Sequence, residues 1–126
     1  MEKNVSYEKT VCYADLDGLG NIAVSKLYNL INNDTYKTLF ELGLTADLLK
    51  KKQFIIFNKK ISVALEKTPM LDDKLHIQTK VKIDDDAIHS HTVILKNNEK
   101  ICELFSEYEV RDTHDTNISL ASLGIL

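Results

Sequence analysis

The sequence predicts an α+β fold in which an antiparallel sheet wraps around one long helix. Apolar residues recur at helical spacing from Val24 to Leu42, and the period then changes to two along the rest of the chain. Short polar turns divide this second part into strands, which indicates hairpin connections. Strands that are grouped together, instead of alternating with helices, are typical of the α+β class.

The first predicted strand covers residues 5–13 and precedes the helix. Its alternate residues would share one face of the sheet: Val5, Tyr7, Lys9, Val11 and Tyr13. The turn at Gly18 and Gly20 interrupts this pattern before the helix begins.

The predicted helix covers about 18 residues, and at 1.5 Å per residue it would span roughly 27 Å, enough to cross a small sheet. Leu30, Tyr36 and Phe40 widen its apolar stripe, so we expect the helix to be largely buried. Gly43 is expected to end the helix as a C-terminal cap. A polar connection that includes Lys50–Lys52 then leads to the next strand.

Four further strands are predicted at residues 54–66, 75–83, 87–95 and 100–111. The turn signals between them are Pro69 with Leu71–Lys74, then Asp84–Asp86, then Asn97 with Asn98. The tail from Asp112 is weakly patterned, although the apolar run 120–126 could dock on the core. No repeat or linker interrupts the chain, so residues 1–126 are predicted to form a single domain.

Composition narrows the class of protein. A chain of 126 residues with 44% apolar and 28% charged residues has the size and makeup of one globular domain. The net charge of −3 argues against a nucleic-acid-binding protein. No signal pattern or membrane-length apolar run is found, and Cys12 and Cys102 are too few for a disulfide framework, so we expect a cytoplasmic protein. Exposed sheet edges favour a homodimer joined edge to edge.

The segment Tyr13–Ile22, which reads YADLDGLGNI, carries the clearest chemical signal. It places two carboxylates, Asp15 and Asp17, and two glycines directly before the start of the helix. The first N–H groups of a helix have no partner within the helix and carry partial positive charge. They can stabilise a carbonyl oxygen as it becomes an oxyanion, while a carboxylate acts as base or nucleophile. The segment is therefore a candidate site for acyl transfer or thioester hydrolysis.

Two segments resemble a known family. Tyr13–Ile22 is similar to an aromatic-x-Asp-x-Asp-x-x-Gly-x-hydrophobic motif, and Pro69–Thr79 is similar to a proline and Leu-Asp-Asp turn before a strand. Over roughly residues 5–112 the chain resembles the hotdog-fold acyl-CoA thioesterases of the hydroxybenzoyl-CoA thioesterase-like group. Within that group it is nearest to the acyl-CoA thioesterases of the Tol–Pal gene cluster.

The resemblance implies a catalytic carboxylate at Asp17 and an oxyanion-binding backbone N–H near Val24, with Asn21 as an orienting group. It also implies hydrolysis of an acyl-CoA, or of an acyl-carrier-protein thioester, across the interface of a homodimer or homotetramer. No metal or redox cofactor is required. Whether Asp17 activates water or attacks the carbonyl stays open.

Further residues are expected to contact the substrate. Tyr13, Gly20 and Tyr28 lie in or just after the motif, although a tyrosine at helical spacing such as Tyr28 more often belongs to the core. Lys59 and Lys60, together with Lys50–Lys52, could attract the phosphates of coenzyme A or an acidic carrier protein, or could simply be solvated.

The chain also departs from the family pattern. Asn21 stands where many members have histidine, and Asn32, Asp34 and Thr35 replace a Glu-x-x-Arg pattern on the helix. These changes favour one alternative, an acyl-thioester-binding module without hydrolysis, such as a sensor or biosynthetic accessory. A second alternative is a hotdog thioesterase that releases polyketide chains, because the triplet Gly20-Asn21-Ile22 also resembles that group. Retention of Asp17 favours the acyl-CoA branch.

Several residues also have simpler explanations. Asp17 could end the strand or cap the helix, Asn21 could be the helix N-cap, and Asp15 is expected to hydrogen-bond the turn. Cys12 could be a nucleophile but has no histidine placed beside it, so packing is the expected role. The pair His89 and His91 could share a metal only with a third ligand, which the spacing does not supply.

Overall fold

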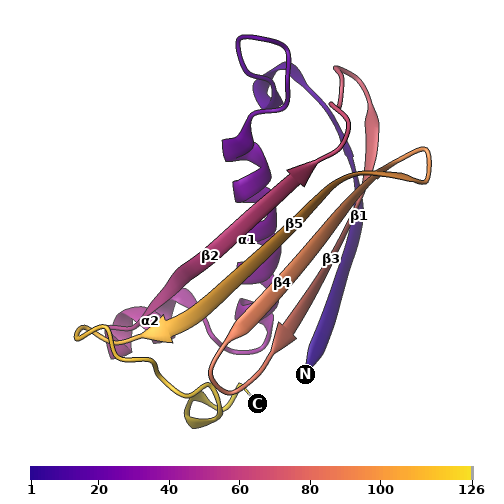
Figure 1. Cartoon of the computed structure of the whole chain (residues 1–126). Coiled ribbons are helices and arrows are strands. Elements are labelled where there is room, and N and C mark those ends of the chain that lie inside the picture. The colour runs from indigo at the N-terminus through magenta and orange to yellow at the C-terminus, as the bar shows by residue number, and fades with distance from the viewer. Residues whose placement is uncertain (126) are drawn as a thin grey trace.

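The computed structural model describes residues 1–125 and consists of a five-stranded antiparallel sheet with one long helix lying across one face (Figure 1). The strand order is β1-β3-β4-β5-β2, so the strands β3, β4 and β5 form a meander between two edge strands. This arrangement confirms the predicted α+β class. The elements are β1 Glu2–Thr10, η1 Tyr13–Asp15, α1 Val24–Glu41, α2 Ala46–Lys52, β2 Ile55–Leu65, β3 Lys74–Ile83, β4 Ile88–Lys96, β5 Glu99–Arg111 and η2 Ala121–Leu123.

Strand β1 lies three residues earlier than predicted, and Tyr13 is not part of it. The chain leaves the ladder because Val11 bonds instead to the β2–β3 loop, donating to Asp73 O at 2.9 Å and accepting from Asp72 N at 2.9 Å. A short 3₁₀ turn follows, in which Tyr13 is 80% exposed. The four later strands match their predicted ranges within one residue at each end.

Helix α1 covers the predicted range and ends as expected, with Gly43 in the left-handed region at φ 108°. The helix buries one face only, so the expectation that it is largely buried is wrong. Phe40 is 41% exposed, and Lys26 and Glu41 face solvent on the opposite side.

Helix α2 occupies the segment predicted to be a polar connection. The Thr45 hydroxyl caps it by accepting the Leu48 N–H at 3.2 Å, and Lys50–Lys52 form its last turn. Cations near a helix C-terminus are favoured by the helix dipole, which gives this lysine run a structural role.

The core between α1 and the sheet has two apolar clusters. One surrounds Leu27 and Ile31 near the start of α1, and the other surrounds Leu39 and Tyr108 near its end. The C-terminal tail contributes Leu120 and Ile125 to the second cluster, which confirms the predicted docking of this end, while Leu126 lies outside the described residues. No helix among residues 1–125 combines the length and the apolar character needed to cross a membrane.

Candidate active site

The Asp17 carboxylate closes the loop that leads into α1. Its Oδ1 atom accepts the backbone N–H groups of Leu19 at 2.8 Å and Asn21 at 3.1 Å. The Asp17 N–H in turn donates to the Asn21 carbonyl at 2.7 Å, and Leu16 forms an isolated β-bridge with Ile22. Oδ2 of Asp17 accepts no hydrogen bond from residues 1–125 and is therefore available to a substrate or a water molecule. Asp17 is exposed.

Gly20 allows this loop to turn back on itself. Its φ of 82° lies in the left-handed region, which glycine adopts without steric cost. The Gly20 N–H donates to the backbone carbonyl of Asp17 at 3.1 Å. Asp17 therefore accepts hydrogen bonds from this loop through its backbone as well as through its carboxylate.

Helix α1 begins at Val24, a few residues after this loop. The N-cap is Ala23, whose side chain offers no acceptor, so the N-cap role considered for Asn21 is wrong. Within the described part of the chain, the N–H groups of Val24 and Ser25 donate no hydrogen bond. The end of this helix of 18 residues therefore presents free donors and the positive end of the helix dipole.

Asp15 has a structural role in the turn, as the sequence predicted. Its buried carboxylate accepts the Cys12 N–H at 3.0 Å and the Cys12 thiol at 3.3 Å, and it pairs with Lys9 at 3.2 Å. Burial opposes ionisation, but these hydrogen bonds and the Lys9 charge hold the pKa of Asp15 below its ordinary value. Cys12 is exposed and contacts this carboxylate, so the expectation of a buried packing cysteine is wrong for this residue.

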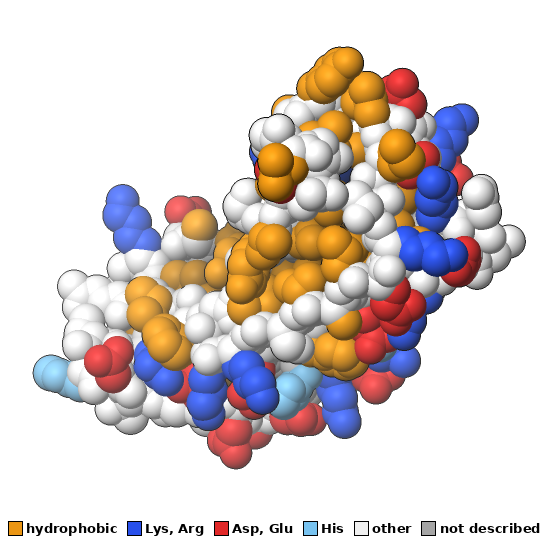
Figure 2. Space-filling model, turned by 45° about the horizontal axis from the view of Figure 1, so that its top comes forward, with side chains coloured by type: hydrophobic (Ala, Val, Ile, Leu, Met, Phe, Trp, Pro, Cys, Tyr) orange, Lys and Arg blue, Asp and Glu red, His pale blue; other side chains and the backbone are white. Residues whose placement is uncertain are grey.

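Exposed apolar side chains lie in the segment that contains the Asp17 loop, and a further one lies in the β2–β3 loop, which bonds to Val11. Tyr13, Leu19 and Val24 are 80%, 88% and 55% exposed, and Met70 from the β2–β3 loop is 65% exposed. Tyr28 lies one helical turn after Val24 and is half-buried. Figure 2, which brings this end of the molecule forward, shows hydrophobic side chains gathered on one face with charges mainly around its margin. Such a surface suits an acyl chain or a partner subunit.

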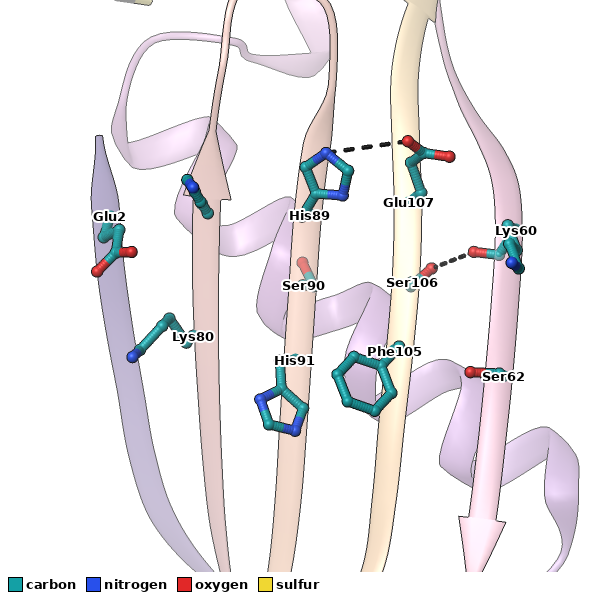
Figure 3. A pocket seen from close by; sticks show the side chains of 11 residues that line it. Glu2, Lys60, Ser62, Lys80, His89, Ser90, His91, Phe105, Ser106 and Glu107 are labelled. Carbon is teal, nitrogen blue, oxygen red and sulfur yellow. Dashed lines mark hydrogen bonds and ion pairs between the residues drawn. The ribbon is translucent and has the colours of Figure 1, made fainter.

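The two lysines predicted to bind substrate lie on β2. Lys59 is at a β-bulge, and Lys60 lines a groove of about 640 Å³ on the sheet face turned away from α1. Figure 3 shows Lys60 on that face with His91 and Phe105, while the helix lies behind the sheet. The structure therefore does not bring Lys60 together with Asp17 in this groove.

His89 and His91 belong to the same groove. Their Nε2 atoms lie 3.8 Å from Glu107 and 3.5 Å from Glu103, respectively. The His91 ring stacks on Phe105 with centroids 4.3 Å apart and the planes 4° from parallel. Among residues 1–125, no group of three or more His, Cys, Asp or Glu side chains is arranged to hold a metal ion.

A buried polar network between α1 and the sheet was not predicted from the sequence. The Asp34 carboxylate accepts the Thr79 hydroxyl at 2.7 Å and the Tyr7 hydroxyl, and Thr79 also contacts the Thr92 hydroxyl at 2.7 Å. Burial raises the pKa of Asp34, against the opposing effect of these hydrogen bonds. Burial, reinforced by the Asp34 charge, raises the pKa of Tyr7 as well. The only sequence feature that could have indicated this network is the presence of the hydroxyl residues Thr79 and Thr92 at inward-facing positions of the strands.

A second cavity, of about 370 Å³, lies where β1 passes the first turns of α1. It adjoins the candidate loop through Asp15 and Ile22, and Lys9 and Lys26 give it positive charge. Its lining residues are Tyr7, Lys9, Asp15, Ile22, Lys26, Asn29, Leu30 and Asn33.

Solved structures of similar shape include thioesterases with the hotdog fold. A 1,4-dihydroxy-2-naphthoyl-CoA thioesterase from Synechocystis has a TM-score of 0.81 and 13% identity, over 94% of this chain and 90% of that one. A gentisyl-coenzyme A thioesterase has a TM-score of 0.77 and 15% identity, over 97% and 100% of the two chains. An acyl-ACP thioesterase from Bacteroides thetaiotaomicron has a TM-score of 0.76 and 14% identity, over 91% of this chain and 49% of that one.

These similarities establish that the chain has the hotdog fold, which the family resemblance implied. Identities of this size show the fold alone. No protein-family model matches the sequence, and no curated protein matches it.

Proposed function

We propose that the protein is a thioesterase that hydrolyses an acyl-CoA, or an acyl-carrier-protein thioester, to the free acid and a thiol. The observation that carries this proposal is the position of Asp17. Its carboxylate is fixed by two backbone N–H groups, has one oxygen free, and lies in the loop that leads to the unpaired donors at Val24.

In the proposed reaction the thioester carbonyl lies over the first turn of α1. The backbone N–H near Val24 stabilises the oxyanion, and Asp17 acts either as the base that activates water or as the nucleophile. Asn21 orients the thioester or the water molecule. Neither route needs a metal or redox cofactor.

The acyl group would pack on the exposed apolar side chains around the loop, including Tyr13, with Gly20 allowing close approach and Tyr28 lining the far side. Thioesterases of similar shape are named for aromatic acyl-CoA substrates and for acyl-ACP, which supports both carriers as candidates. Lys59 and Lys60 would then act by attracting the anionic carrier, since Lys60 lines a different groove. An edge-to-edge homodimer, or a homotetramer, would complete the site.

The test is a thiol-release assay with short, long and aromatic acyl-CoAs and an acyl-carrier-protein thioester. Asp17→Asn should abolish turnover, because an amide oxygen can still accept both loop hydrogen bonds but cannot act as a base or nucleophile. The matched control is Asp72→Asn, since Asp72 is exposed and asparagine tolerates its φ of 68°. Turnover that survives Asp17→Asn would contradict the site assignment.

A non-hydrolytic binding module is the second candidate, and the replacement of the family's Glu-x-x-Arg pattern favours it. Asp34, in that region of the helix, is buried against Tyr7 and Thr79 and is unavailable to a ligand. Binding of a non-hydrolysable acyl-CoA thioether, without turnover of any thioester, would support this alternative.

A further inference from the structure

The cavity between β1 and the first turns of α1 is lined by polar and charged groups from both elements. One side is formed by alternate residues of β1, Tyr7 and Lys9. The opposite side is formed by residues of α1 that are three or four positions apart and therefore share one helix face: Lys26, Asn29, Leu30 and Asn33. The volume of about 370 Å³ lies at the lower end of the range of about 300–1,000 Å³ for ligand pockets. That size suits a molecule much smaller than coenzyme A.

Asp15 offers this cavity a hydrogen-bond acceptor that the fold leaves unused. Only 7% of its side-chain surface is exposed, and its Oδ2 atom takes the Cys12 N–H, the Cys12 thiol and the Lys9 ammonium group. Its Oδ1 atom accepts no hydrogen bond from residues 1–125. In that range the one polar side-chain atom that is both sealed from solvent and without a partner is Nε2 of His91, so Oδ1 of Asp15 stays accessible. This oxygen can therefore accept a donor from a molecule in the cavity.

The charges around the cavity favour a monoanion. Lys9 and Asp15 form an ion pair and balance one another. Lys26 has no ion-pair partner within the part of the chain that the structure describes, so it leaves an excess of one positive charge. The carboxamides of the two lining asparagines add uncharged donors beside it, and Ile22 and Leu30 offer apolar contact to a short carbon chain.

Two residues of the cavity also hold the ends of the Asp17 loop. The backbone carbonyl of Asp15 accepts the N–H of Ala23, the N-cap of α1, at 2.8 Å. At the other end of the loop, Ile22 forms the isolated β-bridge with Leu16. A ligand that restrains Asp15 and Ile22 therefore also restrains the segment between them, which carries Asp17.

We propose that this cavity binds a small carboxylic acid anion that also carries a hydroxyl group, and that the bound acid stiffens the Asp17 loop. The carboxylate of the ligand lies against Lys26 and the asparagine amides, and its hydroxyl donates to Oδ1 of Asp15. The inference goes beyond the proposed function, because none of these contacts depends on whether Asp17 is catalytic.

The first test is an NMR titration of the isotope-labelled protein with 3-hydroxybutyrate at constant ionic strength. Saturable shifts are expected at the backbone amides of Asp15, Ile22 and Lys26, with a dissociation constant on the order of 1–10 mM. Butyrate lacks the hydroxyl and should bind about threefold more weakly or worse, because Oδ1 of Asp15 then loses its donor. Butanediol lacks the charge and should not bind.

Two lysine variants then locate the site. Lys26→Met removes the unpaired charge at an exposed position and should weaken 3-hydroxybutyrate binding about fivefold or more. Lys51→Met is the matched control, since it changes the net charge equally at an exposed position of α2 and should leave binding unchanged. The proposal is wrong if neither acid produces saturable shifts, or if the two variants bind 3-hydroxybutyrate equally well.

Amide hydrogen exchange tests the link to the loop. The N–H groups of Leu19 and Asn21 donate to the Asp17 carboxylate and report on its setting. Saturating 3-hydroxybutyrate should slow their exchange in the wild type, and the same concentration should have less effect in Lys26→Met. Equal exchange with and without the acid in the wild type would refute the coupling. Neither measurement needs thioester turnover, so failure of the thioesterase proposal and failure of this one are distinguishable.

Discussion

The Tyr7 hydroxyl donates to both oxygens of the Asp34 carboxylate, at 3.1 Å and 3.2 Å. This contact joins the edge strand β1 to the middle of α1. The Thr79 hydroxyl donates to the same carboxylate, so the buried Asp34 side chain has hydrogen-bond donors from the two strands β1 and β3. A buried carboxylate without such partners would be strongly destabilising.

Removal of this carboxylate should destabilise the fold. Asp34→Ala leaves the Tyr7 and Thr79 hydroxyls without their acceptor, and we expect a loss of about 2–4 kcal/mol in the free energy of unfolding. Tyr7→Phe removes one donor only and should cost about 1–2 kcal/mol. Chemical denaturation of the three proteins checks this order, and a smaller effect for Asp34→Ala than for Tyr7→Phe would contradict it.

The same residue predicts a pH dependence of stability. Because the folded state raises the pKa of Asp34, the native protein binds a proton that the unfolded chain has released at the same pH. The contribution of Asp34 to stability should therefore fall as pH rises from the ordinary carboxyl range through the raised pKa. The measurement is the difference in unfolding free energy between wild type and Asp34→Asn at several pH values, which removes the effect of the other acids. A difference that grows with pH would refute the assignment.

Gly20 should be more sensitive to substitution than Gly18. An added Cβ meets nothing within 4 Å at either position, but only Gly20 has a positive φ. Gly20→Ala should therefore cost about 1–2 kcal/mol through backbone strain alone, and under the thioesterase proposal it should also lower turnover by shifting the Asp17 loop. Thermal unfolding and thiol release measure both effects. Equal losses in Gly18→Ala would show that the left-handed conformation is not the cause.

Helix α2 should depend on its cap. It has seven residues, of which only Leu48 and Leu49 pack against the core and neither is fully buried, so we expect the hydrogen bond from Leu48 N–H to the Thr45 hydroxyl to contribute to its stability. Thr45→Ala should cost about 1 kcal/mol and should increase hydrogen exchange in residues 46–52, while Thr45→Ser should restore protection. Unchanged exchange in the alanine variant would indicate that packing alone holds this helix.

The two thiols should differ in reactivity. Cys12 is exposed, whereas Cys102 is fully buried and burial raises its pKa to about 11. A thiol reagent should therefore label one cysteine in the native protein and both after denaturation, with Cys12→Ser removing the native signal. Rapid native labelling of the Cys12→Ser protein would contradict the burial of Cys102. The same measurement gives the background of a thiol-release assay, because the exposed Cys12 thiol also reacts with the reagent that detects the released thiol.

The sequence predicted those elements whose periodicity is strong and local. Helix α1 and strands β2 to β5 repeat their apolar pattern over nine residues or more. A single tertiary contact therefore does not change the type of element that the pattern predicts. The end of β1 was wrong because Val11 bonds to Asp72 and Asp73, far along the chain. Helix α2 was missed because a seven-residue segment with three lysines has almost no apolar periodicity.

The residues of the candidate site and of the buried network likewise fall into a local group, which could be predicted, and a group that is distant in sequence, which could not. Asp17, Gly20 and Val24 belong to one continuous segment, so their proximity could be predicted from the sequence. The partners of Asp34 lie at positions 7 and 79, and only the pairing of β1 with β3 brings them together.

The strand order β1-β3-β4-β5-β2 has a kinetic consequence. Strands β3, β4 and β5 follow one another along the chain and can pair through short hairpins, whereas each edge strand pairs with a strand distant in sequence. Closing those long loops costs entropy before any contact is gained, so we expect the meander to form first and both edges to join it late. Conservative substitutions in β1 and β2 should then mainly accelerate unfolding, and those in the meander should mainly slow folding.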